Sequence, residues 1–170
     1  ADVIINYSAS ADAAKEVAEA CRSHGGDIRL VQADMGSDEG CRTLAEAARD
    51  WGRLDILINN AGTTKRVPNH ADLKGLGRED FLHLYSINVA APFLMVQACE
   101  DLLRACHEQT GRTASVLNTS SIAGVTGIGS SVAYAASKGA LNTLTVSLAR
   151  ALAPAIRVNA VCPGYIDTRW

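Results

Sequence analysis

Short apolar runs alternate with longer helical patterns along this chain, and that alternation limits the fold more than any other feature of the sequence. Each apolar run has the length of a strand buried in a parallel sheet. The expected strands cover residues 3–7, 28–31, 54–58, 115–118 and 156–161. The expected helices cover residues 10–24, the stretch after the N-cap candidate Ser37, two segments within 79–107, and residues 132–153.

Strands that alternate with helices in this way are joined by right-handed crossovers, which give a parallel sheet with helices on both faces. The sequence therefore predicts the α/β class, with a doubly wound parallel sheet. A chain of 170 residues that is 48% apolar is long enough for one core and too short for two. We expect a single domain over residues 1–170.

Charge and hydropathy argue against two classes of partner. The formal net charge is -2, from 16 Lys and Arg against 18 Asp and Glu, so no broad basic surface is available for nucleic acid. No apolar run approaches the roughly 18 residues that span a bilayer, and the amino end does not resemble a signal peptide. We expect a cytoplasmic protein with no nucleic-acid and no membrane partner.

The cysteines and histidines do not have the spacing of a metal site. The five cysteines include no C-x-x-C pair, and the four histidines are scattered with no H-x-x-x-H pattern. Cys99 and Cys106 share one expected helix, where their backbones lie about 10 Å apart, beyond disulfide reach. We therefore expect reduced thiols and no metal.

In open α/β sheets, ligands bind outside the carboxyl ends of the strands. The residues that follow the expected strands there are Tyr7-Ser8, Asp34, residues 59–62, residues 119–124 and residues 163–168. Ala61 and Gly62 would let the backbone approach a flat ligand closely, and the amide of Asn60 can both donate and accept hydrogen bonds. An ordinary turn explains Asn-Asn-Ala-Gly equally well.

A more specific constellation is Ser121, Tyr134 thirteen residues later, and Lys138 four residues after that. Tyr134 and Lys138 share one helix face, so the ammonium can lower the phenol pKa and favour a general acid and base. Ser121 could hold a carbonyl oxygen beside the phenol. Ser120 is a weaker choice, because the spacing to the tyrosine selects Ser121. In the alternative interpretation Tyr134 is a half-buried helix residue and Lys138 a surface lysine.

These residues also carry a family resemblance. The motifs are Asn59-Asn60-Ala61-Gly62 after a strand, Asn88 in the next helix, Ser121, Tyr134-x-x-x-Lys138 and Pro163-Gly164-x-x-x-Thr168. Their order and spacing resemble the short-chain dehydrogenase/reductase family over the whole chain, most closely the branch that includes the 3-oxoacyl-[acyl-carrier-protein] reductases. The resemblance implies a Rossmann-type NAD(P)-binding domain and transfer of a hydride between NADP(H), or NAD(H), and a carbonyl or secondary alcohol.

The resemblance also implies roles for residues. Tyr134 is the implied acid and base, Lys138 lowers its pKa and binds the nicotinamide ribose, and Ser121 orients the substrate oxygen. Asn88 holds a water of the proton relay through a local irregularity of its helix. The other implied cofactor contacts are Asp34 at the adenine, Asn60, Ala61 and Gly62 at the adenosine ribose, Pro163 and Gly164 at the nicotinamide ring, and Ile166 and Thr168 at its carboxamide.

The sequence departs from the family at both ends. The family begins with a strand and a glycine-rich turn that binds the pyrophosphate, and it continues beyond the Pro-Gly-x-x-x-Thr motif. Gly127-Ile128-Gly129 follows a loop and lacks a third glycine, so we reject it as the phosphate site. We expect a truncated domain that is inactive on its own, in which strands 3–7 and 54–58 each lack a neighbour.

The remaining expectations concern specificity and partners. The strand over residues 3–7 ends in Asn6-Tyr7-Ser8 and not in a ribose-binding carboxylate, which favours NADP over NAD. The connection 63–78 either borders the substrate pocket or is a solvated insertion. The Ala-rich and Leu-rich helices predict a homodimer or homotetramer, although the same residues could serve the core. The competing function is a non-catalytic binding or scaffold module.

Overall fold

In the computed structural model, which describes residues 1–167, five strands form two separate parallel sheets. In the smaller sheet β1 (Val3–Tyr7) pairs with β2 (Ile28–Gln32). The larger sheet has the order β3-β4-β5, with β3 (Ile56–Asn59), β4 (Ala114–Thr119) and β5 (Ile156–Val161). Every pairing is parallel, which confirms the predicted α/β class.

Helices connect the strands in the order that the sequence predicts. The crossovers contain α1 (Ala11–Arg22), α2 (Asp38–Glu46), the 3₁₀ turns η1 (Arg49–Trp51) and η2 (Leu73–Gly75), α3 (Arg78–Tyr85), α4 (Ala91–Thr110), α5 (Ala123–Thr126) and α6 (Val132–Leu152). A π-helical turn, η3 (Ser86–Ala90), joins α3 to α4. The side chain of Ser37 accepts a hydrogen bond from the backbone N–H of Gly40, so its predicted role as the N-cap of α2 is confirmed.

The structure differs from the sequence prediction most clearly in two places. The segment before Ser131, expected to be a loop, contains α5, which is too short to show a helical period. Gly124 permits this helix, because a Cβ there would lie 2.5 Å from the carbonyl carbon of Lys138. The expected strand at residue 54 begins at Ile56, because the N–H of Leu54 donates to the carbonyl of Leu102 in α4.

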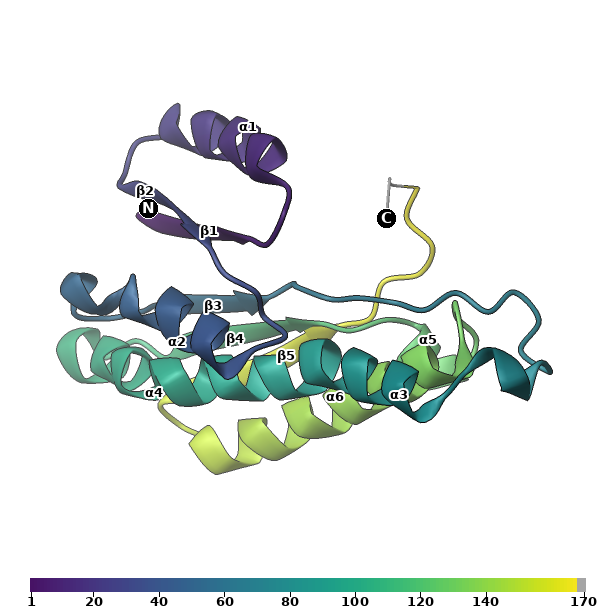
Figure 1. The fold of residues 1–170 in the computed structure, drawn as a ribbon. Helices are drawn as coiled ribbons and strands as arrows, with labels where there is room; N and C mark the ends of the chain where they lie inside the picture. Colours follow the sequence, from purple (N-terminus) through teal and green to yellow (C-terminus); the bar gives the residue numbers. More distant parts are fainter. Residues whose placement is uncertain (168–170) are drawn as a thin grey trace.

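Figure 1 shows α1 on one side of the strands and the helices α3, α4 and α6 on the other. Helices therefore lie on both sides of the strands, as expected for a doubly wound fold, although the second face of the larger sheet carries no helix among the described residues. Ile56 and Ile58 of β3 consequently remain 61% and 57% exposed. As expected, β1 and β3 each pair with a single strand within residues 1–167.

The core lies between the larger sheet and the helices α2, α4 and α6. Residues 78–110 form one helical run that is long and apolar enough to cross a membrane, by length and composition alone, although no such run was expected. Met95, Cys99 and Leu103 of α4 are buried in the core, and Leu103 is fully enclosed. This run is therefore a core helix of the fold.

A buried polar chain fixes the carboxyl ends of β3 and β4 side by side. Asn59 and Asn118 are register partners, and Asn59 Nδ2 donates to Asn118 Oδ1 at 2.9 Å. Asn118 Nδ2 donates to Thr145 Oγ1 at 2.9 Å, which attaches β4 to α6. Buried amides need such partners. Since all the strands are parallel, the segments that follow β3, β4 and β5 start at one edge of the sheet.

Candidate active site

The segment after β4 places Ser121 beside the end of β5. The N–H of Ser120 donates to the carbonyl of Val161 at 2.8 Å, and the N–H of Ile122 donates to the carbonyl of Pro163 at 2.9 Å. These two backbone bonds bracket Ser121. Its Oγ accepts a bond from the N–H of Ala123 at 3.1 Å, which begins α5. Ser121 thus lies next to the segment expected to hold a nicotinamide ring.

Tyr134 lies in the first turn of α6 and is only 7% exposed. The N-cap Ser131 holds this turn, because its Oγ accepts a bond from the N–H of Tyr134. The phenol is hydrogen-bonded to the hydroxyl of Ser121. Burial raises the pKa of Tyr134, and the bond to Ser121 lowers it by less, so the net pKa lies above its usual value. The structure thus brings the two predicted side chains together.

Lys138 follows one helical turn later and is 4% exposed, so the alternative of a surface lysine is wrong. Its Nζ lies 5.8 Å from the ring centroid of Tyr134 and donates to the carbonyl oxygen of Thr119 at 2.8 Å. Burial lowers the pKa of Lys138 to about 8. The expected lowering of the Tyr134 pKa by this ammonium is not found, since burial raises that pKa and the contribution that lowers it comes from Ser121.

Asn88 occupies the π-helical turn η3 and is fully buried. Its Oδ1 accepts from the N–H of Thr63 at 2.8 Å, and its Nδ2 donates to the carbonyl of Thr63 at 3.0 Å. The amide therefore holds the backbone just after Gly62. The local irregularity expected in this helix is the π turn itself.

The residues Asn60, Ala61 and Gly62 follow β3 at the same edge of the sheet. Asn60 and Ala61 are exposed, and a Cβ added to Gly62 would lie 3.6 Å from Lys138 Nζ and 3.4 Å from Asn88 Oδ1. The backbone of Gly62 thus lies close to the buried ammonium of Lys138, whereas an ordinary surface turn would need no such contact.

The segment after β5 carries the last expected contacts. Pro163 is half-buried against the Ser121 loop, whereas Gly164 and Ile166 are exposed. Thr168 lies outside the described residues. Asp34, the expected adenine contact, is exposed after β2, and its Oδ1 accepts from the N–H of Gly36 in a tight turn.

The connection between β3 and α3 is attached to the loop before α6. The N–H of Val67 donates to the carbonyl of Ser130 at 2.8 Å, and His70 Nε2 lies 2.8 Å from the carbonyl oxygen of Gly129. The hydroxyls of Thr64 and Ser130 also share a hydrogen bond. The connection therefore borders the Ser121 and Tyr134 site and is not a free solvated insertion.

Sequence reasoning missed some residues that build the site. The capping hydroxyl of Ser131 could have been found, because a serine directly before a helical pattern is a start signal. Thr119 and Ser137 gave no such signal, since a backbone carbonyl and a buried helix hydroxyl have no pattern of their own. Ser120, expected to be a weaker substrate ligand, is buried and donates to the carbonyl of Lys138 at 3.2 Å.

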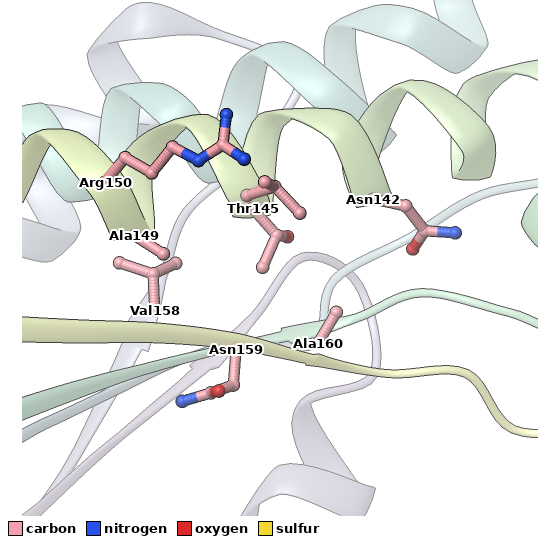
Figure 2. A pocket seen from close by; sticks show the side chains of 8 residues that line it. Asn142, Thr145, Ala149, Arg150, Val158, Asn159 and Ala160 are labelled. Carbon is pink, nitrogen blue, oxygen red and sulfur yellow. The ribbon is translucent and has the colours of Figure 1, made fainter.

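A groove of about 550 Å³ lies elsewhere, between α6 and β5. Figure 2 shows Val158 and Ala160 pointing from β5 toward α6, while Asn159 points to the other face. No expected site residue lines this groove. Within residues 1–167, no group of three or more His, Cys, Asp or Glu side chains is placed to hold a metal ion.

Comparison with known proteins gives a consistent family. The short chain dehydrogenase family matches residues 1–170. A 3-oxoacyl-[acyl-carrier-protein] reductase of Synechocystis is 31% identical over 168 residues, which are 98% of this chain and 64% of the relative's length. The Pseudomonas aeruginosa RhlG/NADP active-site complex has a TM-score of 0.86 at 32% identity, over 98% of this chain and 64% of that one.

A second solved structure carries the other nicotinamide dinucleotide. The NADH-dependent reductase A1-R' complexed with NAD has a TM-score of 0.87 at 28% identity, over 97% of this chain and 68% of that one. Among the curated relatives, the chain spans 64% of the length of the first two that it matches.

Proposed function

This chain belongs to the short chain dehydrogenase family, and on that premise we propose that the protein transfers a hydride between a nicotinamide dinucleotide and a carbonyl or secondary alcohol. The observation that carries the proposal is the hydrogen bond between the buried phenol of Tyr134 and the hydroxyl of Ser121, with Lys138 beside the ring. Such a pair can hold one substrate oxygen and exchange one proton with it.

The proposed contacts of this chain reach both the nicotinamide end and the adenosine end of the dinucleotide. The ammonium of Lys138 has three N–H groups, and one of them donates to the carbonyl of Thr119, which leaves hydrogens for a ribose hydroxyl. The further proposed contacts are Asp34 at the adenine, Asn60, Ala61 and Gly62 at the adenosine ribose, Pro163 and Gly164 at the nicotinamide ring, and Ile166 and Thr168 at its carboxamide. When bound, the cofactor supplies or receives the hydride.

The residues of this chain move the proton. Ser121 donates a hydrogen bond to the substrate oxygen, and Tyr134 donates its proton to that oxygen as negative charge develops there. The high pKa of Tyr134 in this structure keeps the phenol protonated and ready to donate. The ammonium of Lys138, 5.8 Å from the ring centroid, places positive charge near the phenolate that is left behind, although burial keeps the net pKa of the phenol above its usual value. Asn88, through its place in the π turn, holds the water through which the proton is replaced.

The preferred cofactor is NADP. The last residues of β1 carry no carboxylate that would repel a 2′-phosphate, and the amide of Asn6 is already used by the carbonyls of Val31 and Ala33. The proposed assembly is a homodimer or homotetramer in the cytoplasm. Phe93 of α4 and Val146 of α6 remain exposed for such contacts, while most of the apolar residues of α4 serve the core.

A turnover assay tests this proposal. The whole protein, and not residues 1–170 alone, is purified and mixed with NADPH or NADH and a panel of ketones and 3-oxoacyl thioesters. Loss of the reduced nicotinamide absorbance is compared with formation of the alcohol. Equal amounts of oxidised cofactor and alcohol support the proposal. Cofactor binding without turnover on any carbonyl would instead support the non-catalytic binding module.

A further inference from the structure

Ser137 lies in α6 between Tyr134 and Lys138, and its side chain is fully buried. Its hydroxyl donates to the carbonyl oxygen of Tyr134 at 2.8 Å. The hydroxyl oxygen of Ser137 in turn accepts a bond from Asn88 Nδ2 at 3.0 Å. A hydroxyl has one hydrogen, so the bond to Tyr134 leaves the oxygen lone pairs free for the amide. One buried oxygen therefore joins the turn that carries the tyrosine to the π turn.

The second partner of Asn88 fixes how its amide is oriented. The N–H of Thr63 requires the oxygen of the amide, and the carbonyl of Thr63 requires one of the two amide hydrogens. The other hydrogen is left for Ser137. Without that hydroxyl, a buried N–H would have no acceptor, which is unfavourable. Ser137 is thus the element that completes the hydrogen bonding of Asn88.

Three segments of the site meet through this hydroxyl. Ser137 belongs to α6, Asn88 to η3, and Thr63 follows directly after Gly62. We propose that Ser137 is a positioning residue, which sets the distance between Tyr134 and the Gly62 segment by holding the amide of Asn88. This proposal rests on the proposed function for its effect on rate, because only there does that distance set the geometry of hydride and proton transfer.

A rate effect follows from the required geometry. A small displacement of a group that orients the reactants can lower the rate by orders of magnitude while binding changes little. In Ser137→Ala we therefore expect kcat to fall by about 10-fold to 100-fold, with KM for NADPH within about threefold of the parent value. A residue with only a structural role would lower stability and leave kcat unchanged.

The same helix offers a matched control. Thr145 is also buried, its hydroxyl donates to the carbonyl of Leu141 at 2.8 Å, and it accepts a bond from the amide of Asn118 at 2.9 Å. Its contacts include no predicted site residue. Thr145→Val removes that hydroxyl with little change in volume, as Ser137→Ala does. We expect Thr145→Val to lower the melting temperature and to leave kcat within about twofold.

A double-mutant cycle tests whether Ser137 acts through Asn88. We expect Ser137→Ala to lower kcat in the parent protein and to have no further effect on kcat in the Asn88→Ala background. Hydrogen exchange at the amide of Thr63 gives a readout that does not depend on turnover. Exchange there should quicken at least about tenfold in Ser137→Ala and remain unchanged in Thr145→Val. Ser137→Cys, which has a weak acceptor of similar size, should give intermediate values and serves if the alanine variant does not fold.

The outcomes separate the two proposals. If the parent protein turns over no carbonyl, the proposed function fails, and the exchange at Thr63 still tests the link between Ser137 and Asn88. If the parent is active, the positioning role is overturned by a kcat for Ser137→Ala within twofold of the parent. It is overturned equally by a kcat loss that persists in the Asn88→Ala background, or by unchanged exchange at Thr63.

Discussion

The ammonium of Lys138 donates a 2.8 Å hydrogen bond to the carbonyl oxygen of Thr119, the last residue of β4. This bond anchors the second turn of α6 to the strand that leads into Ser121. It keeps a cation inside the fold, beside the ring of Tyr134, where burial makes the charged form less favourable. The position of Lys138 and its charge are therefore linked, and the reaction rate should change with pH as the ammonium loses its proton.

The first prediction concerns that pH dependence. Burial lowers the pKa of Lys138 to about 8, so the ammonium loses its proton as pH rises through about 8. The pKa of Tyr134 is raised, so the phenol keeps its proton over that range. For carbonyl reduction we expect kcat/KM for NADPH, which reports ionisations of the free enzyme, to fall above about pH 8.

The control for this profile is Lys138→Arg. A guanidinium keeps its charge far above the range of the assay, so the fall above about pH 8 should disappear even if the rate is lower throughout. A parent profile that stays flat from about pH 6 to pH 10 would show that the charge of Lys138 does not limit the reaction.

The second prediction concerns the choice of cofactor. We expect kcat/KM to favour NADPH over NADH by at least about tenfold, because β1 ends without a ribose-binding carboxylate. Tyr7 is the last residue of β1, and Tyr7→Asp should lower this ratio at least about tenfold by repelling the 2′-phosphate. Tyr7→Asn, of similar shape but uncharged, should change the ratio much less. A parent protein that favours NADH tenfold would reverse the assignment.

The third prediction concerns the packing of α5 against α6. A Cβ on Gly124 would lie 2.5 Å from the carbonyl carbon of Lys138, a contact that only displacement of a backbone can relieve. Gly124→Ala should lower the free energy of unfolding by about 1–3 kcal/mol and reduce kcat, because Ser121 is on the same loop.

Gly139 offers the matched substitution across the same contact. A Cβ there would meet the carbonyl oxygen of Gly124 at 3.4 Å, which is ordinary contact, and alanine favours the helix. Gly139→Ala should be neutral or stabilising in thermal unfolding. Equal stability of the two alanine variants would contradict the proposed packing.

Much of the fold could be predicted from the sequence, because buried parallel strands and long helices leave clear periods. The strand over residues 3–7 and the helix at 132–153 were located almost to the residue. The α5 turn could not be predicted, since it depends on how closely Gly124 approaches α6. The sequence also could not predict which faces of the two sheets are covered by helices, since helix placement depends on which elements lie beside β3.

The residues of the site were predicted more completely than the directions of their pKa shifts. Spacing alone places Tyr134 and Lys138 on one helix face. The depth of burial decides the direction of each pKa shift, and depth comes from long-range packing that a local pattern does not contain. The hydrogen bond that Asn88 donates to Ser137 joins residues 49 positions apart, so no local pattern could predict it.

The most direct test of Tyr134 as the acid and base is the turnover of Tyr134→Phe at saturating NADPH and carbonyl substrate. Phenylalanine keeps the ring and removes only the proton donor, so cofactor affinity should remain within about threefold of the parent, while kcat falls by about 10² to 10⁴. The Oγ of Ser131 caps this turn by accepting from the backbone N–H of residue 134, which phenylalanine retains, so the helix should be kept. A Tyr134→Phe variant that keeps more than about a tenth of the parent kcat would contradict the assignment of Tyr134 as the acid and base.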